Sequence, residues 1–190
     1  QGPEPQEIIS GILDPVLDSL GLLWGEEAVS LAQTFVAAKI AEDILLRCLP
    51  TESGQLAKGV VVLGNIEDDF HSLGRRIVAS FLRANGWEVH DLGNDVAADV
   101  FVEKALEVGA SVIGVSAMMQ TTALGIRKLR ELIDRRDLGR QLKLAVGGAV
   151  FVSRPELVTE VGGDGSADNA ANAEALFWRL QSAARQEHAS

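Results

Sequence analysis

The sequence has little cysteine and no long hydrophobic run. A single cysteine, Cys48, cannot form an internal disulfide or a thiolate metal cluster, so the chain is typical of a reducing compartment and we expect it in the cytoplasm. The longest apolar stretches, such as residues 60–63, are too short to cross a bilayer. Because no basic leader precedes an apolar run either, we expect neither a membrane span nor a secretory signal.

Basic residues are also scarce. Seventeen Lys and Arg stand against 27 Asp and Glu, which gives a formal net charge of −10. Binding to a phosphate backbone requires clustered positive charge, so we expect no nucleic-acid partner for this segment.

Composition and charge instead favour a folded protein with two differently built regions. The chain is 47% hydrophobic and 23% charged, enough for a core in one domain or in a domain with a small appendage. Apolar residues recur at helical spacing from about residue 7 to 49, interrupted at 21–25. We predict a small helical cap, part of a helical bundle, over residues 5–50.

A second domain is predicted over residues 58–187, where short β-rich runs alternate with amphipathic segments. Such alternation is typical of α/β proteins, and it predicts a doubly wound, five-stranded parallel sheet, a flavodoxin-like variant of the Rossmann fold. Ligands of such sheets bind beyond the carboxyl ends of the strands. The expected strands are 59–66, 87–92, 111–117, 143–146 and 163–166, and the expected helices are 72–85, 97–108, 121–136, 154–161 and 169–185.

The first strand is followed by acidic residues and a histidine, Glu67-Asp68-Asp69-Phe70-His71. A phosphate loop is excluded because it needs several glycines and no repelling carboxylates. In Asp69-x-His71 the carboxylate can accept the proton of one ring nitrogen and leave the other free for a metal. One imidazole is too few for zinc, so the remaining ligands would come from a macrocycle such as a haem or a corrin. The alternative for the tripeptide alone is an acid at a helix start beside a solvated or core histidine.

Three motifs extend this pattern: Asp69-x-His71-x-x-Gly74, Ser116-x-Met118 and Gly147-Gly148. They are separated by 41 residues (75–115) and 28 residues (119–146). In order and spacing they resemble the B12-binding (cobalamin-binding) domain family, and the resemblance spans nearly all of residues 59–185. The preceding helices are similar to the bundle found before this domain in methionine synthase and in corrinoid proteins of methyltransferase systems.

The resemblance implies that cobalamin is the cofactor and that His71 is the lower axial ligand of cobalt, with Asp69 fixing its tautomer. Thr122 stands where methionine synthase has a serine that completes this relay. Ser116 would bind the buried base of the nucleotide tail, and the glycines would leave room for that tail, although each could also serve packing or a strand end alone. The cofactor-binding residues implied are Trp24, Asp68, Asp69, Phe70, His71, Ser72, Leu73, Gly74, Ser116, Met118, Gln120, Thr122, Gly147, Gly148 and Ser166.

Three positions need comment. Met118 replaces the family's leucine, a conservative change of one flexible apolar side chain for another. Ser166 lies where many relatives have a tyrosine, so this position departs from the family pattern. Trp24 would cover the upper corrin face, or it is an ordinary core tryptophan; Gln33 and Thr34 occupy the positions of a Glu-His pair of cobalamin photoreceptors, which argues against that kind of light sensing.

The resemblance therefore implies a methyl-carrying corrinoid protein that shuttles a methyl group on cobalt between a methyl-donor and a methyl-acceptor methyltransferase protein. The chain has no substrate-activating cluster of its own, so whether it counts as an enzyme stays open. The main alternative is a sensory or regulatory cobalamin module. A mutase subunit and, more distantly, a haem-binding relative are also open.

Overall fold

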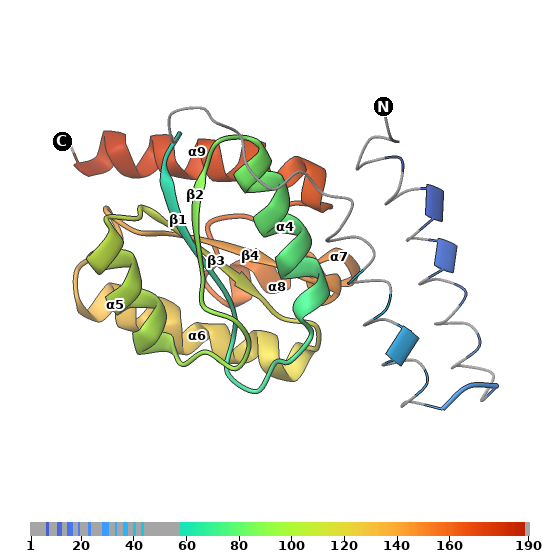
Figure 1. Cartoon of the computed structure of the whole chain (residues 1–190). Helices are drawn as coiled ribbons and strands as arrows, with labels where there is room; N and C mark the ends of the chain where they lie inside the picture. The colour runs from blue at the N-terminus through green and yellow to red at the C-terminus, as the bar shows by residue number, and fades with distance from the viewer. Residues whose placement is uncertain are drawn as a thin grey trace. The chain divides into compact units, whose positions relative to one another are not determined.

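The structure is a computed structural model that describes residues 58–188, except the side chains of residues 171 and 188, together with scattered residues between 7 and 43. The chain divides into two compact units, Gln1–Thr51 and Glu52–Ser190. They are drawn together in Figure 1, and each is described by itself.

In the first unit, the described residues include helical positions such as Pro15, Ser19 and Ile40. Ser30 and Gln33 form a reciprocal cap: the Gln33 amide nitrogen donates to Ser30 Oγ at 3.2 Å, and Ser30 N donates to Gln33 Oε1 at 2.8 Å. This arrangement is a capping box, so Ser30 begins a helix as its residue type favours. Trp24 lies outside the described residues.

The second unit contains a parallel sheet of four strands in the order β2-β1-β3-β4. Its strands are β1 (Val60–Asn65), β2 (Glu88–Asp91), β3 (Val112–Ser116) and β4 (Lys143–Gly147). Strands β1, β3 and β4 are almost wholly buried, which explains their continuous apolar runs, because helices cover both faces of such sheets.

Helices cover the two faces in pairs (Figure 1). Leu82 of α4 (Ser72–Ala84) and Phe177 of α9 (Ala170–His188) belong to one core cluster, whereas Phe101 of α5 (Ala98–Val108) and Ile126 of α6 (Gln120–Arg135) belong to the other. Two layers of helices around a parallel sheet confirm the doubly wound α/β prediction.

The prediction of a fifth strand at 163–166 is wrong. That segment forms only an isolated bridge, Ala145 with Gly165. The physical reason is that a side chain takes the place of the backbone as hydrogen-bond acceptor. The Leu144 amide donates to the Asp164 carboxylate at 2.6 Å, whereas in a regular strand it would donate to a backbone carbonyl. Gly162, with φ +76°, turns the chain just before it.

The helix predicted at 154–161 is present but shorter: α8 (Leu157–Glu160) lies within that range, and a second short helix that was not predicted, α7 (Ala149–Ser153), precedes it. Arg154 lies between them and is followed by Pro155, which disfavours helical conformation in the preceding residue. None of the described helices has the length and apolar composition of a membrane span.

Candidate functional site

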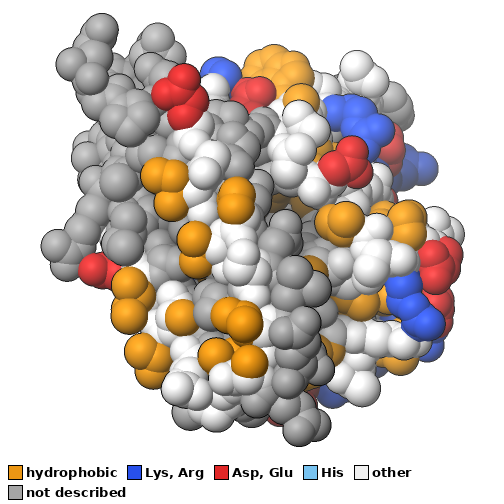
Figure 2. All heavy atoms as spheres, turned by 90° about the vertical axis from the view of Figure 1, so that its right-hand side faces the viewer, with side chains coloured by type: hydrophobic (Ala, Val, Ile, Leu, Met, Phe, Trp, Pro, Cys, Tyr) orange, Lys and Arg blue, Asp and Glu red, His pale blue; other side chains and the backbone are white. Residues whose placement is uncertain are grey.

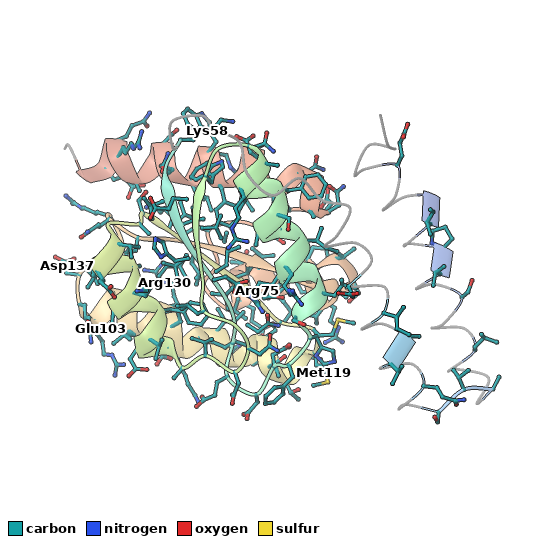
Figure 3. The ribbon with its side chains drawn as sticks, in the orientation of Figure 1. Lys58, Arg75, Glu103, Met119, Arg130 and Asp137 are labelled. Atoms are coloured by element: carbon teal, nitrogen blue, oxygen red, sulfur yellow. The ribbon has the colours of Figure 1, made fainter. Side chains whose placement is uncertain are left out.

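Three strands of the second unit end in register at one edge of the sheet. Asn65 of β1 pairs with Ser116 of β3, and Ser116 pairs with Gly147 of β4. The loops that follow these residues therefore meet at one place, as the fold predicts. In Figure 3, Met119 lies at this end of the unit and Lys58 lies at the opposite end.

Asp69 is the centre of a hydrogen-bond network at this edge. Its side chain is completely buried. Oδ1 accepts hydrogen bonds from the Asn65 side-chain amide and the His71 backbone amide, both at 2.9 Å. Oδ2 accepts from the Met118 backbone amide at 2.7 Å and lies 3.0 Å from the Thr122 hydroxyl. One carboxylate thus ties the loop after β1 to the loop after β3 and to the start of α6.

This environment determines the charge of Asp69. Burial alone would raise the pKa of its carboxyl, but the hydrogen bonds from Met118, His71, Asn65 and Thr122 outweigh burial and hold the pKa below its ordinary value. Asp69 is therefore an anion that accepts hydrogen bonds over the whole neutral range.

His71 faces outward from this buried anion. Its Nδ1 lies 3.3 Å from Asp69 Oδ1, and its side chain is 53% exposed. Because a carboxylate oxygen only accepts, this contact favours a proton on Nδ1 and leaves Nε2 with a free electron pair. Within the described part of the chain, Nε2 has no hydrogen-bond partner. The ring is thus arranged as a nitrogen ligand supported by a carboxylate.

Two residues of this network, Asn65 and Arg75, were not among the predicted site residues. Asn65 is completely buried, and Arg75 is 7% exposed. The signals that could have found them are an amide at the end of a strand that is otherwise apolar, and an arginine on the buried face of an amphipathic helix.

The loop after β1 also contains an unusual backbone conformation. Asp68 has φ +65°, and its amide donates to Asp95 Oδ1 at 2.8 Å; Asp95 itself has φ +56°. Asp is one of the few residue types that tolerate this left-handed region. Asp68 thus shapes the loop that presents Asp69 and His71.

The two glycines of the Gly147-Gly148 pair have different environments. A Cβ on Gly148 would lie 2.0 Å from the Ala117 carbonyl oxygen, and Gly148 has φ +115°, so the backbone alone requires glycine there. A Cβ on Gly147 would meet nothing within 4 Å. Space is therefore left at the end of β4, beside Ser116, whose half-buried hydroxyl makes no hydrogen bond to a described residue.

Large apolar side chains are exposed on the loops next to His71 and Asp69. Phe70 is 59% exposed, Met118 45% and Met119 48%, on the loops after β1 and β3. Exposed apolar side chains, an imidazole with an open Nε2 and an open strand end are groups that suit the chemistry of a large macrocycle. The residues at this edge of the sheet therefore fit cobalamin, the cofactor that the resemblance implies.

Other predicted site residues have different surroundings. Gln120 is exposed and accepts a hydrogen bond from Arg154 at 2.5 Å, and Ser166 follows the bridge residue Gly165 without a contact to Asp69 or His71. In α4, Ser72 is buried and Leu73 is half-buried, while a Cβ on Gly74 would meet nothing within 4 Å.

Several charged groups elsewhere on the surface form exposed pairs, among them Lys128 and Glu67. The ammonium group of Lys128 lies 2.9 Å from a Glu67 carboxylate oxygen, which raises the pKa of Lys128. On the face drawn in Figure 2, the visible Lys and Arg side chains lie close to Asp and Glu side chains. Pairs of this kind contribute little to stability.

Comparison with known proteins agrees with this geometry. The family model for the B12 binding domain matches residues 59–175. The chain is 37% identical over 173 residues to dimethylamine corrinoid protein 2 of Methanosarcina mazei (90% of this chain, 80% of the relative). It is 34% identical over 163 residues to a corrinoid protein of Desulfitobacterium hafniense (83% and 74%).

Among solved structures, the monomethylamine corrinoid protein of Methanosarcina barkeri superimposes with a TM-score of 0.82 at 27% identity, covering 94% of this chain and 85% of that one. The methanol:cobalamin methyltransferase complex MtaBC of the same organism gives 0.56 at 25% identity, covering 95% and 69%. The family match takes in the buried Asp69, the outward His71 and the open end of β4: the chain belongs to the B12-binding domain family.

Proposed function

We propose that this protein is a cobalamin-binding methyl carrier of a methyltransferase system. The observation that carries the proposal is His71, half-exposed at the edge of the sheet and supported at Nδ1 by the buried anion Asp69. Membership of the B12-binding family and similarity to several corrinoid proteins support it.

In this proposal His71 is the lower axial ligand of cobalt and binds it through Nε2. When bound, the corrinoid supplies a cobalt ion that accepts and releases a methyl group. Asp69 keeps the proton on Nδ1 and orients the ring, and Thr122 completes the relay through its 3.0 Å contact with Asp69. These residues tune the ligand and do not react themselves.

The cofactor's nucleotide tail is assigned to the open end of β4. Ser116 has a free hydroxyl there for the tail's base, and the space beside Gly147 would be filled by any side chain. We assign the exposed apolar residues Phe70 and Met118, with Met119, to contacts with the corrin edge. Gln120 and Ser166 are assigned to its periphery.

Substrate choice would reside in partner proteins. One relative of known structure is a complex of a methanol:cobalamin methyltransferase, so we propose methyl-donor and methyl-acceptor methyltransferases as the partners here. We further propose that residues 5–50 form a helical cap in which Trp24 shields the upper corrin face, and that the protein acts in the cytoplasm.

The alternative, a sensory cobalamin module, is not favoured because the relatives reported above are corrinoid proteins. Two measurements on the loaded protein distinguish a methyl carrier from a sensor. Reversible methylation of the loaded protein by a partner methyltransferase identifies a carrier, whereas a change of oligomeric state on illumination identifies a sensor.

The ligand assignment is tested by absorption spectra of protein loaded with hydroxocobalamin. We expect wild-type protein to retain the corrinoid with an axial nitrogen ligand and His71→Ala to lose that axial signature. His90→Ala is the matched control, because His90 pairs with Glu88 on β2 and should leave the spectrum unchanged. Failure of wild type to retain a corrinoid contradicts the function; an unchanged His71→Ala spectrum contradicts only the ligand assignment.

A further inference from the structure

Arg75 is a buried cation linked to the site. Its Nε donates to Asn65 Oδ1 at 2.7 Å, its Nη2 donates to Asn94 Oδ1 at 3.1 Å, and its Nη1 forms an ion pair with Asp91. Arg75 belongs to the first turn of α4, and Figure 3 shows it toward the same end of the unit as Met119. Burying a charge in this way is unfavourable unless every group is well paired, so its partners matter.

The contact with Asn65 determines which end of that side-chain amide faces the site. A guanidinium only donates, so it requires the oxygen of the Asn65 amide to point toward it. The amide nitrogen then points the other way, to Asp69 Oδ1 at 2.9 Å and to the His71 backbone carbonyl at 3.1 Å. Both amide hydrogens are thereby used.

If the side-chain amide of Asn65 were flipped, two hydrogen-bond acceptors would face each other, and so would two donors. Its oxygen would meet the buried Asp69 carboxylate, and its nitrogen would meet the Arg75 donor. Both hydrogen bonds would be lost inside the protein, where an unpaired polar group costs about 1–3 kcal/mol. Arg75 thus decides the orientation of an amide that holds both Asp69 and the backbone of His71.

We propose that Arg75 is a positioning residue for His71, acting through the Asn65 side chain to hold the Asp69 carboxylate and the His71 backbone so that the ring presents Nε2 outward. The inference rests on the proposed role of His71 as the cobalt ligand. It assigns no contact between Arg75 and the cofactor.

The first test uses the protein without cofactor. In protein labelled with nitrogen-15 in its histidines, NMR reports whether the neutral His71 ring carries its proton on Nδ1 or Nε2, and His71→Ala assigns the signals. We expect wild type to favour the Nδ1–H ring. Arg75→Met should lower the ratio of Nδ1–H to Nε2–H about fivefold, the effect of weakening one hydrogen bond of ordinary strength.

Arg76→Met is the matched control, since Arg76 is the next residue of the same helix and is exposed. It should leave the ratio unchanged. Asn65→Leu should lower the ratio as Arg75→Met does, and the double variant should lower it no further, because the two residues act in series. Additive effects of the two changes would overturn action through Asn65.

An unchanged ratio in folded Arg75→Met protein would overturn the proposal. If that variant does not fold, Arg75→Lys, which keeps the positive charge but lacks the Nε–H donor, replaces it. Unfolding of both variants would assign Arg75 to stability alone and would overturn the positioning role as well.

The second test uses protein loaded with cob(II)alamin. Its electron paramagnetic resonance spectrum shows nitrogen splitting when a histidine ligates cobalt. We expect Arg75→Met to lose part of this splitting and Arg76→Met to keep it. Absence of splitting in wild type would contradict the ligand role of His71, while the cofactor-free NMR measurement would still decide the role of Arg75.

Discussion

At the scale of single residues, Asp69 combines complete burial with a full set of hydrogen-bond donors. A carboxylate with several donors is stabilised as the anion, and this explains why one buried charge can serve as the anchor of a surface loop. If a neutral side chain replaced Asp69, some of these donors would lose their hydrogen-bond acceptor.

Replacement of Asp69 by Asn is therefore expected to destabilise the protein. An amide offers one acceptor oxygen, and its nitrogen would face donors, so the free energy of unfolding should fall by about 2 kcal/mol at pH 7. Urea unfolding measures the change. Asp68→Asn is the matched control, because Asp68 is exposed and asparagine tolerates its left-handed backbone.

The same variant gives a pH dependence with a defined sign. The pKa of Asp69 is lower in the folded than in the unfolded protein, so its stabilisation is complete above the unfolded value of about 4 and is lost as pH falls through the lower folded value. The difference in stability between wild type and Asp69→Asn should shrink over that acid range. A constant difference would contradict this account of the carboxylate.

The Gly147-Gly148 pair provides a second prediction at this scale. Gly148→Ala places a Cβ against the Ala117 carbonyl oxygen at a positive φ and should lower the melting temperature markedly. Gly147→Ala meets open space and should leave the melting temperature of the cofactor-free protein almost unchanged. It should nevertheless weaken retention of cobalamin, as measured by gel filtration after loading. Equal retention of cobalamin by wild type and Gly147→Ala would contradict the assignment of the nucleotide tail to the space beside Gly147.

At the scale of secondary-structure elements, a side chain at the edge of β4 supplies a hydrogen-bond acceptor that a neighbouring strand would otherwise supply. The Asp164 carboxylate accepts the Leu144 amide hydrogen, and the backbone pairing is limited to a single bridge. The chain after Gly162 is thereby attached to the sheet without forming a strand.

Asp164→Ala should therefore loosen this edge. It leaves the Leu144 amide without its acceptor and should lower the free energy of unfolding by about 1–2 kcal/mol, which corresponds to a few degrees in melting temperature. Asp168→Ala, at an exposed position four residues later, is the control. Equal melting temperatures of the two variants would show that the Asp164 carboxylate does not stabilise the edge of β4.

At the scale of the whole molecule, the chain divides near residue 51, and the buried members of the core clusters of the described residues lie between Val61 and Leu180. A hydrophobic core contained in one stretch of chain favours independent folding.

We expect residues 52–190 alone to unfold in one cooperative transition, measured by circular dichroism during heating. The fragment should still retain hydroxocobalamin through His71, because Asp69 and Thr122 lie within it. Failure to fold would show that residues 1–51 complete its core. Faster photolysis of a methylated cofactor in the fragment than in the full chain would support the proposed cap.

The sequence by itself determined the class of the fold, because buried parallel strands read as apolar runs and amphipathic helices as periodic ones. Strand ends of a parallel sheet meet at one edge, which predicted that the loop of Asp69 and His71 lies beside the end of the next strand; the resemblance to the B12-binding family added Thr122. Only the tertiary structure decided that 163–166 forms a single bridge, that Gly148 is required by a backbone carbonyl, and that Asn65 and Arg75 join the hydrogen-bond network of Asp69. These outcomes depend on contacts between residues distant in the chain, and local spacing carries no record of which donor meets which acceptor in space.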